Sequence, residues 1–276
     1  LVAKSEAQAA RNWDVFYKNN ETRFFKDRHW TQREWGEDLG IGKGKQLEPV
    51  LLEVGCGVGN MLYPLLERYP NLKCHACDFS KRAVDFVKSH PSYTPERVHA
   101  FVYDLTSTSP PSLVELVMSV GSVSSPPPPA SIPTIPPPTT ISMIFVLSAI
   151  PPQLHEQVLR SMVACLRASS ASASADHTPT PTILLRDYAS GDLAQVRFDS
   201  KDAALPSYRE PTRLSPAAPY YRRGADNTLA YFFDVDQLQR LARRCGLVGE
   251  AKVVERSSEN RKTGVVLRRR FIQARW

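Results

Sequence analysis

Short apolar runs alternate with longer amphipathic stretches through most of the chain after residue 50. Apolar runs that are bounded by Gly, Pro or Asp favour buried strands, whereas apolar residues that recur every three or four positions favour helices. The pattern predicts strands at 50–54, 73–77, 98–103, 141–150, 182–185, 251–255 and 265–272. It predicts helices at 60–68, 81–89, 153–167 and 236–244, with Ser80 as an N-cap and Gly246 as a helix stop.

Strands that alternate with helices pair in parallel and carry helices on both faces of the sheet. We therefore expect an α/β fold, a Rossmann-like, doubly wound and mostly parallel sheet of seven strands. The first forty residues break this rhythm, because they are too aromatic for a linker and too charged for a core strand. We expect 1–48 to form an extension that contacts ligands and 49–276 to form the α/β domain.

Two stretches of low complexity interrupt the domain. Residues 107–140 hold ten of the 23 prolines, and 168–182 are rich in Ser and Ala. Polyproline is stiff, solvated and poor in backbone donors, so 107–140 is predicted to be an inserted loop rather than a folded element. An SH3 or WW ligand is the alternative for this segment. The second stretch is predicted to be flexible.

The net charge of +7 comes mainly from arginine clusters, among them Arg268 to Arg270. Several clusters in one chain favour a polyanionic partner, because each phosphate that is neutralised releases counterions. A solvated basic surface is the alternative, and a membrane surface is a weaker one, since no basic amphipathic helix stands out. We expect no membrane partner, because no window approaches a membrane span.

The cysteines are five in number and form no regular framework, which predicts reduced thiols and an intracellular, cytoplasmic protein. Because the sequence begins at Leu1 and not at Met, a targeting peptide upstream would not be seen, and a mitochondrial location stays open. Cys74 and Cys77 have the spacing of half a zinc site without a second pair. They are predicted to be buried strand residues, and no metal is expected.

Chemistry-bearing residues follow three successive predicted strands. Residues 53–60 (EVGCGVGN) place glycines after the first strand, where the backbone can approach a ligand closely. Asp78 ends the second strand, where its carboxylate can accept both ribose hydroxyls, and Asp104 ends the third, where it can accept an adenine amino group. The carboxyl ends of strands in open α/β sheets line one crevice, so we expect the three to converge. An ordinary loop or cap carboxylate is the alternative for either acid.

The glycine spacing separates two cofactor classes. Dinucleotide dehydrogenases carry GxGxxG, whereas ExGxGxG fits the loop of S-adenosylmethionine-dependent methyltransferases better. Their adenosyl cofactor has no pyrophosphate for a helix N-terminus to bind. We therefore expect S-adenosyl-L-methionine as the cofactor and a class I methyltransferase fold.

Six sequence blocks resemble the eukaryotic tRNA 3-methylcytidine methyltransferases, which modify cytidine 32 of the anticodon loop. The blocks are 12–18 (NWDVFYK), 24–30 (FFKDRHW), 53–60 (EVGCGVGN), 76–80 (ACDFS), 144–149 (IFVLSA) and 185–188 (LRDY). The resemblance covers nearly the whole chain apart from the two stretches of low complexity. The block at 24–30 is the most specific, since a Rossmann-like core does not require it.

The resemblance implies a set of site residues. Those expected at the cofactor are Trp13, Tyr17, Glu53, Gly55, Gly57, Asp78, Asp104, Leu105 and Ile144. Those expected at the catalytic acceptor side are Arg186, Asp187 and Tyr188. The resemblance also implies that Lys26, Arg28 and His29 help to position the N-terminal segment or the tRNA. Apart from the resemblance, Phe198 is a candidate for stacking on the base. Tyr221, Arg222 and Arg223 are expected at the substrate, because the excursion between the fifth strand and the next helix often covers the acceptor in this fold class. A helix packed on the core is the alternative for the N-terminal aromatics, and a surface hairpin is the alternative for 220–223.

The chain departs from the family pattern in two places. The proline-rich segment replaces a short link before the fourth strand that carries an aspartate near its start. In 221–233 one residue is added, and an arginine is missing just before Tyr231, so substrate contacts transfer less directly there.

The implied chemistry is methyl transfer to N3 of a cytosine that is splayed out of its stack. Asp187 is predicted to accept from the cytosine amino group, with Tyr188 and Phe198 as stacking partners. The expected partner is tRNA, with a helper such as seryl-tRNA synthetase as a further possibility. Alternatives are a methyltransferase acting on a protein or small molecule, a catalytically silent RNA-binding homologue, and a dehydrogenase.

Overall fold

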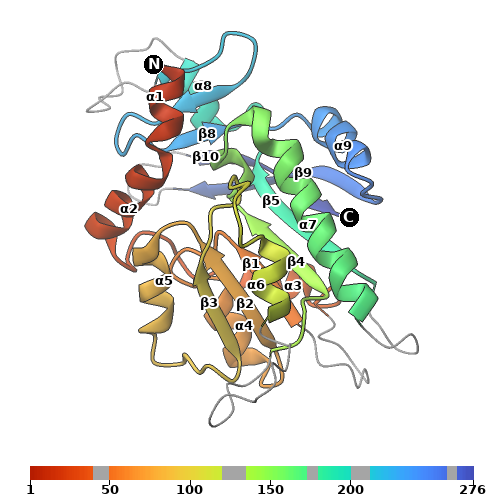
Figure 1. Cartoon of the computed structure of the whole chain (residues 1–276). Helices are drawn as coiled ribbons and strands as arrows, with labels where there is room; N and C mark the ends of the chain where they lie inside the picture. Colours follow the sequence, from red (N-terminus) through yellow and green to blue (C-terminus); the bar gives the residue numbers. More distant parts are fainter. Residues whose placement is uncertain (40–49, 120–134, 173–179, 200–211, 260–265) are drawn as a thin grey trace. The chain divides into compact units, whose positions relative to one another are not determined.

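A computed structural model describes residues 1–39, 50–119, 135–172, 180–199, 212–259 and 266–276. Its main sheet has seven strands in the order β3-β2-β1-β4-β5-β10-β9, and a second sheet has the order β6-β7-β8 (Figure 1). The sheet is mostly parallel and carries helices, as predicted. The predicted boundary after residue 48 lies outside the described residues.

The chain divides into two compact units. The glycine-loop unit comprises Asp14–Ser142 and Gln157–Leu184, and the C-terminal unit comprises Leu1–Trp13, Met143–Glu156 and Leu185–Trp276.

The glycine-loop unit is built on the buried strand β1 (Val50–Val54), where Leu51 and Leu52 are fully covered. Complete burial of such a side chain stabilises the fold by about 1.5–3 kcal/mol. Strand β2 (Lys73–Asp78) pairs in parallel with β1 and with β3 (Val98–Val102), so the carboxyl ends of all three strands lie at one edge. The helices of this unit are α3 (Trp30–Trp35), α4 (Leu62–Arg68), α5 (Lys81–Lys88) and α6 (Leu113–Ser119).

Helix α5 begins where the sequence predicts. The hydroxyl of Ser80 accepts a hydrogen bond from the amide of Ala83 over 3.3 Å, which caps the helix. Its buried residues are Ala83, Val84 and Val87, on the face that contacts β2 and β3.

The C-terminal unit contains the antiparallel pair β9 (Glu250–Glu259) and β10 (Val266–Arg275). Helix α9 (Val235–Arg244) contacts β9, is capped by Asp234 and is followed by Gly246 with a positive φ of 79°. Helix α8 (Leu193–Asp199) contacts β10. The second sheet consists of β6 (Thr212–Arg213), β7 (Tyr220–Arg222) and β8 (Leu229–Tyr231). Helix α1 (Val2–Ala7) also belongs to this unit.

Four elements contain residues assigned to both units. They are α2 (Ala9–Asn20), β4 (Thr140–Ile144), α7 (His155–Ser172) and β5 (Thr182–Tyr188).

The prediction of an inserted loop without folded elements over 107–140 is wrong for α6 and for Thr140, where β4 begins. Helix α6 forms because Ser112 and Glu115 make a reciprocal capping pair, and because its residues Leu113 and Val117 are buried. Ile135 is also fully buried. The proline-rich residues 120–134 lie outside the described part of the chain.

Two further predictions need correction. The strand predicted at 141–150 ends at Ile144, because Phe145 takes a positive φ of 58° and a 3-10 helix follows at Leu147–Ala149. The segment predicted to be flexible from 168 continues α7 as far as Ser172. Within it, the Ser169 hydroxyl is buried and bonds the carbonyl of Cys165 at 2.9 Å.

All five cysteines are free and buried, and Cys74 and Cys77 lie in β2, as predicted. Within the described ranges, no group of three or more His, Cys, Asp or Glu is arranged to hold a metal ion. A search of the described residues finds no helix that combines the length and the apolar character of a membrane span.

Candidate active site

The glycine loop after β1 is joined to the acid that ends β2. Gly55, Gly57 and Gly59 have φ values of 62°, 54° and 88°, a backbone region that favours glycine. The amide of Gly57 donates to Asp78 Oδ2 over 3.0 Å, and the amide of Ser80 donates to Asp78 Oδ1 over 2.9 Å. The loop and the carboxylate therefore form one unit.

Burial sets the protonation of this carboxylate. Asp78 is almost wholly buried, which raises its pKa to about 6, although the bonded backbone amides act in the opposite direction. A carboxylate oxygen can accept more than one hydrogen bond, so both oxygens of Asp78 keep capacity for ligand hydroxyls.

Tyr17 lies directly against the loop. A Cβ atom at Gly57 would come within 2.8 Å of the Tyr17 hydroxyl oxygen, so only glycine leaves room for the ring. Tyr17 is buried, and its burial, with the neighbouring Asp78 charge, holds its pKa well above the usual value. Trp13, predicted beside Tyr17, is half-buried and is assigned to the C-terminal unit.

Glu53 is a buried acid with an unused oxygen. Desolvation raises its pKa to about 8, and the positive charge of Arg28 acts in the opposite direction. Its Oε2 atom has no hydrogen-bond partner among the described residues. A buried oxygen without a donor is costly, so this atom is suited to accept from a ligand.

The sequence block 24–30 is hydrogen-bonded to Asn60, the residue that follows the glycine loop. The side-chain amide of Asn60 donates to the Phe25 carbonyl at 3.2 Å and to Asp27 Oδ1 at 3.1 Å. The amide of Arg28 donates to the Asn60 carbonyl at 2.8 Å. These bonds hold Arg28 where its charge acts on Glu53. Lys26 and His29 of the same block are exposed.

The remaining predicted cofactor residues are distributed as follows. Asp104 is exposed, and its Oδ1 accepts from the amide and the hydroxyl of Thr106 at 2.9 and 2.7 Å. Leu105 next to it is buried in the same unit. Ile144 is buried and belongs to the C-terminal unit.

The predicted acceptor-side acid is fully buried in the C-terminal unit. Asp187 Oδ2 accepts from the amide of Ser148, and its Oδ1 accepts from the amide of Tyr188, both at 2.9 Å. Burial raises its pKa to about 6, while the hydrogen bond from the Ser148 hydroxyl, the two backbone bonds and the charge of Arg223 counteract this shift. The carboxylate thereby ties the turn after β4 to the end of β5.

An arginine–aromatic cluster surrounds the half-buried ring of Tyr188. The Phe145 ring lies 4.9 Å from it and the Phe232 ring 5.6 Å, between centroids. The guanidinium carbons of Arg223 and Arg269 lie 5.5 and 5.8 Å from its centroid. Tyr188 is thus packed on several sides, and it offers less open surface than a freely exposed stacking ring. Arg186 is buried, with its guanidinium 5.2 Å from the Phe271 ring.

The predicted tRNA contacts of the second sheet are largely internal. The Tyr221 ring is fully buried, and its hydroxyl donates to Asp199 at 2.7 Å. Phe198 is half-buried and packs against Tyr221 at 5.3 Å. Two arginines hold the turn between β7 and β8: Arg222 bonds the Asn227 side chain, and Arg223 bonds Thr228 Oγ1 and the Leu229 carbonyl at 3.0 and 2.8 Å.

Comparisons with known proteins agree with this arrangement. The methyltransferase domain family matches residues 52–170. The crystal structure of an SAM-dependent methyltransferase from Anabaena variabilis superposes with a TM-score of 0.51 at 12% identity, covering 96% of this chain and 93% of that one, which supports the fold.

Two sequence relatives are much closer. The tRNA N(3)-methylcytidine methyltransferase trm141 of Schizosaccharomyces pombe is 36% identical, over 100% of this chain and 94% of the relative. The human tRNA N(3)-cytidine methyltransferase METTL6 is 35% identical, over 99% of this chain and 81% of the relative. The chain belongs to the tRNA N(3)-methylcytidine methyltransferase family.

Two sets of polar contacts in this member of the family are not predicted from the sequence. Asn60 is the residue that fastens the 24–30 block, and its place directly after the glycine motif was the available signal. Asp192, which is fully buried, and Arg269, which is partly exposed, form an ion pair at 2.9 Å. No local pattern indicates it, since 76 intervening residues separate the two positions.

Proposed function

We propose that this chain transfers a methyl group from S-adenosylmethionine to N3 of cytidine 32 in the anticodon loop of tRNA. The observation that carries the proposal is the glycine loop bonded through Gly57 to the buried Asp78, in a chain whose relatives are tRNA N(3)-methylcytidine methyltransferases.

The residues around the loop fit an adenosyl sulfonium cofactor. Three left-handed glycines shape the loop beside Asp78. Asp78 offers acceptors for ribose hydroxyls, and the unpartnered Oε2 of Glu53 suits a donor such as the amino group of the methionine part. Asp104 and Leu105 are the proposed adenine contacts. When bound, the cofactor supplies an electrophilic methyl group on a positively charged sulfur.

The protein needs no strong general base for this reaction, because the N3 lone pair of cytosine is already nucleophilic at neutral pH. Its main task is to hold the acceptor base in line with the methyl group. Orientation of this kind supplies on the order of 7–11 kcal/mol of the barrier. The base must also leave its stack, at a cost of a few kcal/mol.

We place Arg186, Asp187 and Tyr188 on the acceptor side. Asp187 accepts from the amides of Ser148 and Tyr188 and from the Ser148 hydroxyl, and its two oxygens together keep capacity for a further donor, such as the cytosine amino group. Since Asp187 is fully buried, direct contact requires the side chains that cover it to move. Its negative charge would also stabilise the cationic 3-methylcytosine.

The positive net charge of the chain supports a tRNA partner. Lys26 and His29 are exposed, so their side chains can contact the tRNA. A helper such as seryl-tRNA synthetase belongs to the proposal only as a stimulating partner. We expect its addition to raise methylation of serine tRNAs more than that of other tRNAs.

Incubation with methyl-labelled cofactor tests the substrate class. We expect label in total tRNA and none in a protein extract or a small-molecule pool from the same cells. Label in protein or small molecules alone would favour another methyltransferase of the same fold. Binding of tRNA without binding of cofactor would favour a catalytically silent homologue.

A further inference from the structure

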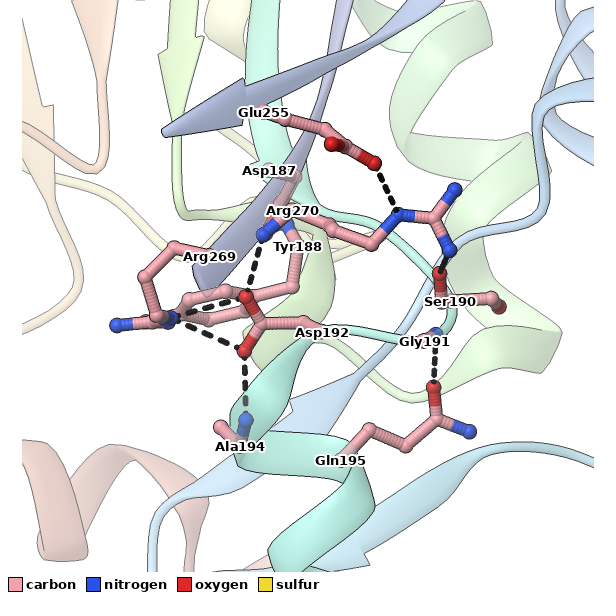
Figure 2. A network of polar contacts seen from close by, with 10 residues as sticks. All are labelled: Asp187, Tyr188, Ser190, Gly191, Asp192, Ala194, Gln195, Glu255, Arg269 and Arg270. Carbon is pink, nitrogen blue, oxygen red and sulfur yellow. Dashed lines mark hydrogen bonds and ion pairs between the residues drawn. The ribbon is translucent and has the colours of Figure 1, made fainter. Parts of the chain in front are cut away.

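Asp192 is a buried carboxylate at the start of α8 that joins three parts of the C-terminal unit (Figure 2). Its side chain is fully covered, yet it accepts several hydrogen bonds. Arg269 Nε donates to both of its oxygens, at 2.9 and 3.2 Å, and the amides of Arg270 and Ala194 donate at 2.8 Å each. A buried charge is tolerated when its lone pairs are filled in this way.

The turn before Asp192 is shaped to present it. Gly191 has a positive φ of 79°, and a Cβ atom there would lie 2.5 Å from Arg270 Nη1. The Gly191 amide donates to Gln195 Oε1 at 2.7 Å, and Arg270 Nη1 donates to the Ser190 carbonyl at 3.0 Å.

The three consecutive arginines of β10 differ in their contacts. Alternation along the strand puts Arg268 and Arg270 on one face and Arg269 with Phe271 on the other. Arg270 serves the turn and forms an ion pair with Glu255 at 3.3 Å. Arg268 is exposed.

Arg269 uses only one edge of its guanidinium. Within the described residues, its side-chain hydrogen bonds both run from Nε to Asp192, which fixes the plane of the group. The carbon of the guanidinium lies 5.3 Å from the Phe271 centroid and 5.8 Å from the Tyr188 centroid. Its terminal Nη groups have no hydrogen-bond partner among the described residues, and 35% of the side chain is exposed. A guanidinium held at Nε presents its terminal Nη groups to two oxygens of an anion such as a phosphate.

The local charge favours such an anion. The Tyr188 and Phe271 rings are flanked by three guanidiniums, those of Arg186, Arg223 and Arg269. Two buried carboxylates, Asp187 and Asp192, lie in the same cluster. Arg186 is buried, whereas 35% of the Arg269 side chain is exposed and can meet a phosphate at the surface.

We propose that Arg269 binds a backbone phosphate of the RNA substrate next to the target nucleotide, and that Asp192 is the positioning residue that holds its guanidinium in place. This inference rests on the proposed function, because it takes tRNA as the substrate. A purely structural pin between α8 and β10 is the competing account.

Four variants separate the two accounts: Arg269→Ala, Arg269→Lys, Asp192→Asn and, as a matched control, Arg268→Ala. The lysine keeps the charge and can pair with Asp192, but its single ammonium cannot also present a second fixed edge. Binding to an anticodon stem–loop RNA is measured over a series of salt concentrations, and cofactor binding and thermal unfolding report on integrity.

We expect Arg269→Ala and Arg269→Lys to weaken RNA binding on the order of tenfold, since a hydrogen bond to a charged group is lost. The slope of log K against log salt should fall by about 1 in Arg269→Ala. Asp192→Asn should weaken binding while keeping the salt slope closer to wild type. Arg268→Ala should change affinity far less than Arg269→Ala.

Replacing the loop phosphates one at a time by uncharged methylphosphonates locates the contact. One position should weaken the wild type as much as Arg269→Ala does, and should not weaken that variant further. The inference is overturned if Arg269→Ala binds like Arg268→Ala, or if every replacement weakens the variant and the wild type equally. A wild-type protein that binds none of these RNAs and methylates no tRNA overturns the proposed function itself.

Discussion

The backbone amide of Gly57 and the carboxylate of Asp78 are hydrogen-bonded over 3.0 Å, which joins the loop after β1 to the end of β2. The bond is strongest when Asp78 is ionised, because a charged acceptor roughly doubles its strength. The shape of the loop and the ability of the carboxylate to accept ribose hydroxyls therefore depend on the same proton.

Cofactor affinity should depend on the ionisation of Asp78. Because its pKa is raised to about 6, we expect affinity to fall as the pH drops below that value. Asp78→Asn should bind weakly and lose this part of the pH profile. Calorimetric titration with S-adenosylhomocysteine, repeated between about pH 5 and about pH 8 in steps of roughly half a pH unit, measures the affinity of both proteins. An unchanged profile in the variant would count against this role.

The free energy of unfolding should depend on Glu53 in a definite direction. Its pKa in the folded chain is about 8, well above the value of 4.5 for an ordinary glutamate. Between pH 4.5 and pH 8 the folded state therefore binds more protons than the unfolded state. Stability should therefore decline as the pH rises through this window, and Glu53→Gln should remove that part of the decline. Urea unfolding across the window tests it, with the exposed Glu67→Gln as a control. Parallel stability curves for wild type and Glu53→Gln would contradict the assignment.

Gly57→Ala should damage the cofactor site in two ways. The left-handed backbone costs about 1–2 kcal/mol for a residue with a Cβ. The new Cβ also meets the Tyr17 hydroxyl at 2.8 Å. We expect cofactor binding to weaken by roughly tenfold or more, with partial recovery in Gly57→Ala/Tyr17→Phe, which removes that oxygen.

Gly246→Ala is the matched control for Gly57→Ala. It carries similar backbone strain at the end of α9, with φ of 79°, and should lower stability without changing cofactor affinity. Equal loss of cofactor affinity in both variants would show that strain at any glycine suffices.

Asp187 should be needed for turnover rather than for cofactor binding. We expect Asp187→Ala to lower the rate of tRNA methylation by about 10- to 100-fold, as for loss of a hydrogen bond to a charged group. Asp187→Asn keeps an acceptor for the Ser148 amide. Full activity in the asparagine variant would assign the residue to holding the turn, and unchanged turnover in Asp187→Ala with intact cofactor binding would rule out the acceptor role.

The elements that the sequence predicts well are those whose signals are local. Strand β1 is an unbroken apolar run before glycines, and α5 carries both its cap at Ser80 and a clear amphipathic period. Asp78 lies at the end of its strand as expected, because a short strand has little freedom in where it ends. The glycine loop and its acid were therefore accessible from the sequence.

The sequence does not predict elements that depend on tertiary contacts. It also does not predict an element whose local signal lies in a segment of unusual composition. The many prolines near α6 favour a loop, although Ser112 and Glu115 have the spacing of a capping box. The turn at Phe145 is stabilised by a backbone bond from Phe145 to the Arg186 carbonyl, which no local pattern reveals. Tyr221 is predicted at the substrate because it lies between the fifth strand and the next helix. Local sequence does not show that its ring is buried in the small sheet and that its hydroxyl bonds Asp199.

Nucleoside mass spectrometry of a single tRNA after reaction tests the central claim most directly. The protein is incubated with methyl-labelled S-adenosylmethionine and either that tRNA or a matched tRNA in which cytidine 32 is replaced by uridine. We predict labelled 3-methylcytidine in the first tRNA and none in the second. Equal labelling of both tRNAs, or a labelled nucleoside other than 3-methylcytidine, would contradict the proposed function.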